Sequence, residues 1–192
     1  MSRFGIAVLL GVVMLGAEAV GGQTTAASSE APQLEPAKVF AGPLRTAGNA
    51  VVGLAEAFPE ELYGFAPTSS MFVAGRTTEY KGVRTFAEQV AHVASSNYEY
   101  LNAMGLEMDK DPKKIEQLKT KAELMQALKD SYAAAQKAAA ATTTATVFEG
   151  IGPKKAATRA AYLSAIAWHT MDHYGQMVEY ARMNGIVPPQ SR

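Results

Sequence analysis

The histidines are the residues of this sequence whose type and spacing are best suited to metal chemistry. The chain has 192 residues, with three histidines and no cysteine. His169 and His173 lie four residues apart in a stretch with helical periodicity, so their side chains share one helix face, one turn apart. Two imidazoles at this spacing can bind one metal ion. Because cysteine is absent, imidazole and carboxylate are the ligands available for such an ion.

A third histidine, His92, lies on a different predicted helix. It is turned roughly 110° from the centre of that helix's apolar stripe, toward the side of Gln89 and Ser96. Three histidines and an open position are typical of a catalytic metal site, in which the fourth ligand is water or substrate. The spacing alone leaves a second interpretation open, in which the histidines are hydrogen-bonded polar residues of the core.

The residues between the paired histidines exclude one class of enzyme. The sequence from residue 169 to 173 is HTMDH, which lacks the glutamate that follows the first histidine in the HExxH motif. A zinc protease of that type uses this glutamate as its general base. The pair therefore does not predict a protease of that class.

Four stretches with helical periodicity must position the histidines. Thr85 with Glu88, and Thr120 with Glu123, have the spacing of capping boxes at the starts of the second and third helices. Gly185 is suited to the left-handed position that ends the fourth. The four predicted helices cover residues 43–58, 85–105, 120–141 and from near 153 to 185.

The connections between the predicted helices are uneven in length. Residues 59–84 and 106–119 form long links, and such links in a compact domain usually cross the fold or cover part of it. The charged run at residues 109–121 is mixed in sign and is predicted to be solvated surface. The sequence thus predicts an all-α fold, a four-helix bundle with a long crossover loop between helices 1 and 2.

The N-terminal segment has the features of a signal peptide. Arg3 precedes an uncharged run at residues 4–16, and Ala17-Glu18-Ala19 provides the small residues of a cleavage site. This run would span about 20 Å as a helix, less than the roughly 30 Å of a bilayer core, although an uncleaved anchor is the alternative. We expect residues 1–19 to be the signal peptide, 20–39 a flexible lead-in and 40–192 the helical domain. The protein would be exported, periplasmic or secreted, with no stable membrane span after cleavage.

Composition and charge restrict the partners of the chain. Eighteen basic and eighteen acidic residues balance to a formal charge of zero, which excludes a nucleic-acid binder driven by charge. With 48% apolar residues, the chain can build a substantial core. If the protein is an enzyme with a metal site, we expect its substrate or ligand to be a small molecule.

Three segments resemble the DinB-like superfamily, also called DinB/YfiT-like, a family of DNA-damage-inducible metalloenzymes unrelated to the polymerase of similar name. They are PEELYGFAP at residues 59–67, RTFAEQVAHVASSN at 84–97 and HTMDHYGQMVEYARMNGIVPP at 169–189. The last contains the H-x-x-x-H-x-G-Q stretch of that family. The resemblance extends over roughly residues 40–190.

The resemblance implies a fold and a site. The family fold is a four-helix bundle with up-down-down-up topology, and its hallmark is a three-histidine site for a divalent metal. The matching positions are His92, His169 and His173, with zinc or nickel as the metal and manganese or iron as alternatives. Known activities in the family are transfers that use low-molecular-weight thiols, and some isomerisation. The signal peptide departs from that pattern because such thiols are cytosolic.

Two further residues are candidates for supporting the site. Asp172 could orient a ligand imidazole, and Gln176 could hydrogen-bond a metal-bound water, the expected reactive group. These features predict an exported metal-dependent hydrolase or transferase that acts on a small molecule. A non-enzymatic metal- or ligand-binding stress protein is the alternative. A third hypothesis is a structural helical bundle whose histidines bind no metal and which can form a homodimer through an exposed helix face.

Overall fold

The computed structural model describes residues 34–71, 73–75 and 79–192, and it is mostly helical. The predicted signal peptide and most of the predicted lead-in lie outside the described residues. The elements are α1 (Pro36–Ala57), α2 (Phe86–Ala103), α3 (Pro112–Ile115), α4 (Lys121–Ala140), α5 (Arg159–Met183), the strands β1 (Gly150–Ile151) and β2 (Ala157–Thr158), and short 3-10 turns at Glu60–Leu62, Ser69–Met71, Pro153–Lys155 and Pro189–Ser191.

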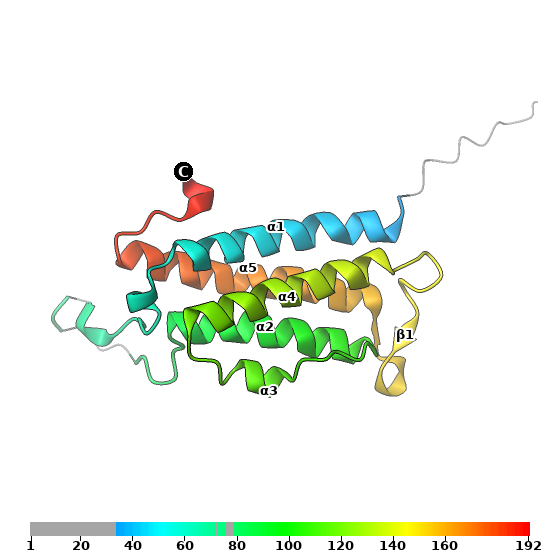
Figure 1. Cartoon of the computed structure of the whole chain (residues 1–192), viewed down its shortest axis with the longest axis horizontal. Coiled ribbons are helices and arrows are strands. Elements are labelled where there is room, and N and C mark those ends of the chain that lie inside the picture. Colours follow the sequence, from blue (N-terminus) through cyan, green and yellow to red (C-terminus); the bar gives the residue numbers. More distant parts are fainter. Residues whose placement is uncertain (1–33, 72, 76–78) are drawn as a thin grey trace, which may run out of the picture. The chain divides into compact units, whose positions relative to one another are not determined.

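Four long helices form the body of the domain. Helices α1, α2, α4 and α5 run along the length of the domain, and the short α3 lies beside α2 (Figure 1). Both α1 and α2 pack against α4 and against α5, and α3 packs on α2. The all-α prediction is therefore confirmed. The described residues contain one small sheet, in which β1 and β2 pair antiparallel.

The ends of α2 and α4 follow the predicted capping patterns. The Thr85 hydroxyl accepts a hydrogen bond from the Glu88 backbone N–H at 3.2 Å, and the Glu88 carboxylate accepts one from the Thr85 N–H at 2.7 Å. Thr120 and Glu123 form the same reciprocal pair at the start of α4. Because these bonds satisfy free N–H groups of the first turn, they fix where each helix begins.

The end of α5 also follows its prediction, because Gly185 adopts a left-handed φ of 72°. Its N–H donates to the Arg182 carbonyl at 3.0 Å, and the Ile186 N–H donates to the Ala181 carbonyl at 2.9 Å. These two bonds satisfy carbonyls that the helix leaves free, and glycine takes this backbone conformation at low cost. The last turn of α5, and with it the register of the helix, is therefore fixed.

Two helix starts differ from the sequence prediction. Helix α1 begins at Pro36 instead of Pro43, which lies inside the helix. Helix α5 begins at Arg159 instead of near Pro153, because Lys154 has a φ of 59° and the β1–β2 hairpin occupies this stretch. The Thr158 side chain then caps α5 by accepting a hydrogen bond from the Ala161 N–H at 3.2 Å. A helix pattern in sequence does not reveal a positive φ at lysine, which few such residues adopt.

The crossover between α1 and α2 is packed where it meets α2. The N–H groups of Phe86 and Ala87 donate to the carbonyls of Phe65 and Tyr63, each at 2.8 Å. The Phe86 ring stacks on Phe58 with a centroid distance of 3.7 Å. The start of α2 is thus held by both the end of α1 and the crossover, which sets the position of the residues one and two turns further along α2.

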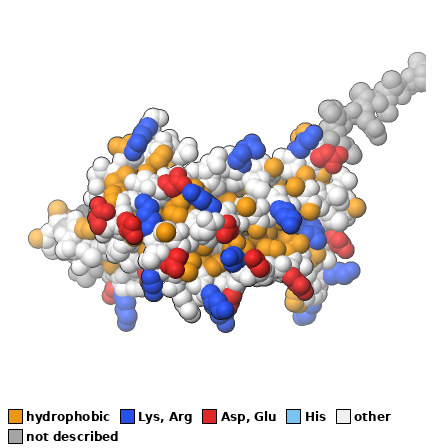
Figure 2. Space-filling model, in the orientation of Figure 1, with side chains coloured by type: hydrophobic (Ala, Val, Ile, Leu, Met, Phe, Trp, Pro, Cys, Tyr) orange, Lys and Arg blue, Asp and Glu red, His pale blue; other side chains and the backbone are white. Residues whose placement is uncertain are grey.

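The core extends along the interior of the four long helices. Leu54, Val90, Leu128 and Ile166, one from each long helix, are each 0% exposed. Buried polar contacts also join the helices, because Asn97 of α2 donates to Ser131 of α4 at 3.0 Å. Charged side chains of both signs alternate over the face shown in Figure 2, with apolar side chains between them. Among the described residues, no helix is long and apolar enough to cross a membrane.

Candidate metal centre

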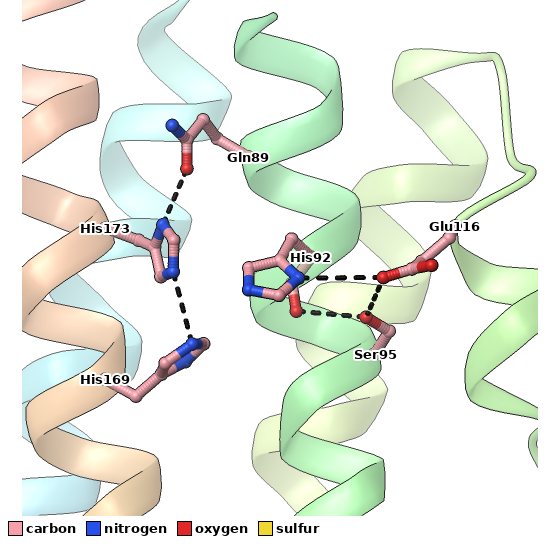
Figure 3. A network of polar contacts seen from close by, with 6 residues as sticks. All are labelled: Gln89, His92, Ser95, Glu116, His169 and His173. Carbon is pink, nitrogen blue, oxygen red and sulfur yellow. Dashed lines mark hydrogen bonds and ion pairs between the residues drawn. The ribbon is translucent and has the colours of Figure 1, made fainter. Parts of the chain in front are cut away.

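The three histidines meet between α2 and α5. One ring nitrogen from each of His92, His169 and His173 can be chosen so that all three lie within 4.8 Å of one another. The Nε2 atoms of His169 and His173 are 3.2 Å apart. The His92 ring centroid lies 5.2 Å from that of His169 and 4.8 Å from that of His173. The side chain of His92 projects from α2 toward the pair on α5 (Figure 3).

Gln89 determines which nitrogen of His173 carries the proton. The Gln89 Oε1 lies 2.7 Å from Nδ1 of His173, and its Nε2 donates to Oε1 of Gln176 at 3.0 Å. Since the amide oxygen can only accept, Nδ1 of His173 must be the donor. The Nε2 of His173 is then an acceptor, and it faces Nε2 of His169 at 3.2 Å. Gln89 and His173 are 2% and 6% exposed, so water does not replace this contact.

Glu116 has a similar relation to His92. Its Oε1 lies 3.6 Å from Nδ1 of His92 and accepts a hydrogen bond from the Ser95 hydroxyl at 3.2 Å. The Ser95 hydroxyl is also 3.1 Å from the His92 carbonyl (Figure 3). A carboxylate beside Nδ1 favours a proton on that nitrogen and leaves Nε2 of His92 as the acceptor. Among the described residues Nδ1 of His92 has no hydrogen-bond partner, so Glu116 acts on this ring through its charge, whereas Gln89 holds His173 by a hydrogen bond.

All three histidines are held in their neutral form. Burial lowers the pKa of His92 and of His169. Burial, together with the neighbouring imidazoles and the positive charge of Arg84, lowers the pKa of His173 to about 4, while Asp172 opposes this effect. Glu116 opposes the shift at His92. Neutral imidazole is the form that binds a metal ion.

These features fit a divalent metal ion. In a tetrahedral site with metal–nitrogen distances of 2.0–2.1 Å, two ligand nitrogens lie about 3.3 Å apart, close to the spacing of the two Nε2 atoms. Nδ1 of His169 is buried without a hydrogen-bond partner among the described residues. The neighbouring side chains therefore do not satisfy both nitrogens of this imidazole. Imidazole nitrogens that converge on one point suit zinc, copper, iron or nickel.

The three histidines lie within the part of the chain that matches a known protein family. The model of the DinB superfamily matches residues 44–177, a range that contains all three histidines. This chain belongs to the DinB superfamily. No curated protein matches it with significant similarity.

The two predicted supporting residues of this DinB-superfamily chain, Gln176 and Asp172, connect to His173 through Gln89. Gln176 accepts from Gln89 and donates to Oδ2 of Asp172 at 3.3 Å. Asp172 therefore connects to His173 through two amide side chains, and its charge raises the pKa of His169 and His173. Their roles at a metal site stay predictions.

Two residues that contact the histidines were not predicted as site residues. Gln89 lies three residues before His92 on the same side of α2, so its position was visible in the sequence. No local signal marks Glu116, because it comes from the charged run predicted to be solvated surface. That prediction was wrong in part: Ile115 of α3 is 5% exposed and anchors this segment against the core, which brings Glu116 to α2.

Aromatic side chains surround His169. The rings of Tyr100 and Trp168 lie 5.8 and 6.0 Å from the His169 ring, each close to perpendicular to it. Tyr162 lies beside Tyr100, at a centroid distance of 6.3 Å. Trp168 is 61% exposed, so this side of the centre is open to solvent. A small molecule could therefore reach His169 past an aromatic surface.

Proposed function

We propose that this DinB-superfamily protein is exported and binds one divalent metal ion, zinc or nickel, through His92, His169 and His173. We further propose that it acts on a small molecule as a metal-dependent hydrolase or transferase. The observation that supports the metal site best is the convergence of three neutral imidazoles, two of them with Nδ1 beside an acceptor. When bound, such a cation acts as a Lewis acid that polarises an oxygen of the substrate.

The side chains around the three histidines have different roles in this proposal. Gln89 and Glu116 hold His173 and His92 so that their Nε2 atoms face the metal. Burial of His173 excludes water from one side of the centre, while the exposed ring of Trp168 borders the side from which a substrate enters. Fixed ligands in a partly dry site strengthen electrostatic interactions with a reacting group.

A second candidate is a metal-binding stress protein without turnover. The two carboxylates nearest the histidines favour it: Glu116 lies beside Nδ1 of His92, away from the other two rings, and Asp172 contacts Gln176. Neither is placed as a general base on the Nε2 side. The two candidates share the metal site and differ in turnover.

We also propose the up-down-down-up topology of the family for this bundle. Helices α1 and α2 each pack against both α4 and α5, so they lie diagonally across the bundle. A connection between diagonal helices must cross the bundle end, which agrees with the length of the segment between α1 and α2.

The test is metal content. The chain from Val20, without an affinity tag that contains histidine, should carry about one equivalent of zinc or nickel by elemental analysis, as expected for a single site. The His169→Ala/His173→Ala double variant should carry none. Met171→Ala is the matched control, because Met171 lies between the two histidines and is 42% exposed. If the wild type binds no metal and is not stabilised by added zinc, nickel or manganese, the proposal is wrong.

A further inference from the structure

A cavity of about 330 Å³ lies beside His92. Its polar lining comes from the start of α2 and from the residue that follows α3: Arg84, Glu88, His92 and Glu116. His92 is therefore shared between the cavity and the three-histidine centre. A volume of this size can hold part of a small organic molecule. A substrate group placed there would lie next to His92, one of the three proposed ligands.

The two carboxylates in the cavity already have partners. The Glu88 carboxylate accepts hydrogen bonds from the Thr85 N–H at 2.7 Å and from the Thr85 hydroxyl at 3.0 Å. It also lies in the first turn of α2, where the helix dipole stabilises a negative charge. The Glu116 carboxylate accepts from Ser95 and lies beside Nδ1 of His92. Both negative charges are therefore used within the protein.

Arg84 differs from them because its side chain has no such partner. Among the described residues, no hydrogen bond or ion pair involves the Arg84 guanidinium. The backbone that follows the side chain is nevertheless fixed: the Tyr180 hydroxyl donates to the Arg84 carbonyl at 3.0 Å, and the next residue, Thr85, caps α2. The Arg84 charge lowers the pKa of His92, His169 and His173, so it acts on all three rings.

We propose that Arg84 binds an anionic group, a carboxylate or a phosphoryl group, of the small-molecule substrate and so places the substrate beside the three histidines. A guanidinium offers a planar fork of N–H donors that matches both groups. This inference rests on the proposed function, because it names the substrate class of the same centre.

Anion binding to single-site variants tests this inference. The zinc-loaded chain is titrated with benzoate and, separately, with inorganic phosphate, by calorimetry. Arg84→Gln should weaken binding about tenfold, as expected for loss of a charge-assisted hydrogen bond. Arg84→Lys should retain part of the affinity. Arg45→Gln is the matched control, since Arg45 is an exposed arginine of α1, which packs on α4 and α5. Thermal unfolding checks that each variant is folded.

Three outcomes would overturn the inference. The first is equal affinity of wild type, Arg84→Gln and Arg45→Gln for both anions. The second is no anion binding by the zinc-loaded wild type. The third is binding of methylammonium that Glu88→Gln abolishes, which would assign the cavity to a cation. Weaker wild-type binding at higher salt, with a smaller salt effect in Arg84→Gln, would support an ionic contact.

The metal proposal and the Arg84 inference can fail separately. If zinc does not bind, the same anions are added to the metal-free protein and the Arg84 Nε–H signal is followed by NMR. A shift of that signal that saturates, and that Arg45→Gln leaves unchanged, would keep the anion site while the metal site fails. No shift would overturn both. Zinc binding without any effect of Arg84→Gln would overturn only the anion site.

Discussion

Gln89 offers the sharpest test of how the protein prepares its histidines. Replacing Gln89 with leucine removes the acceptor of the 2.7 Å contact with Nδ1 of His173 and keeps a side chain of similar size. Nothing else then fixes the proton on Nδ1. The Nδ1–H is also left without a partner in a place where Gln89 and His173 are 2% and 6% exposed.

Two magnitudes follow from this geometry. Removing a hydrogen-bond partner that orients a metal-ligating histidine costs about 10–100-fold in metal affinity, and the burial of Gln89 places the expected loss toward the upper end. A buried donor without a partner costs about 1–3 kcal/mol, so the metal-free variant should unfold more easily by that amount. Glu116→Gln should lose less affinity, because its carboxylate is half-exposed and 3.6 Å from His92.

The assay is a competition titration with a chromophoric chelator, together with urea unfolding of the metal-free protein. Gln126→Leu is the matched control, because it makes the same substitution at an exposed position of α4. Wild-type zinc and nickel affinity in Gln89→Leu, in a protein whose His173→Ala variant loses the metal, would refute the reasoning. Gln89 would then be a packing residue only.

Two further predictions concern the histidines themselves. Trp168 is the only tryptophan of the chain and its ring lies 6.0 Å from that of His169, so bound Ni²⁺ should quench the fluorescence of the wild type but not of His169→Ala. Equal quenching in both proteins would place the nickel elsewhere. Burial lowers the pKa of His173 from 6.5 to about 4, so the unfolded chain takes up a proton first as the pH falls. As the pH falls from 6.5 to about 4, the free energy of unfolding of the metal-free wild type should decrease by roughly 3 kcal/mol. Below the lower pH, His173 should cause no further decrease. His173→Asn should lack this part of the slope in urea unfolding followed by circular dichroism, and an unchanged slope would contradict the assignment.

Local features of the sequence determined the helix ends and one half of the site. The capping boxes at Thr85 and Thr120 and the left-handed Gly185 depend on residues within one turn, so the sequence alone reveals them. The shared face of His169 and His173 is equally local, because four residues make about one turn of any α-helix. Local patterns were misleading at the start of α1, which begins at Pro36 instead of Pro43, and at the start of α5, which a hairpin and a positive φ at Lys154 delay.

The tertiary structure decided the other half of the site. His92 meets the pair because α2 packs against α5, and periodicity left its direction open. Gln89 reaches across the same interface to His173, while Glu116 is carried to His92 by the packing of α3 on α2. These contacts join residues that are far apart in the chain. Their geometry depends on how whole helices pack against one another, and the spacing of residues along a single helix does not determine that packing.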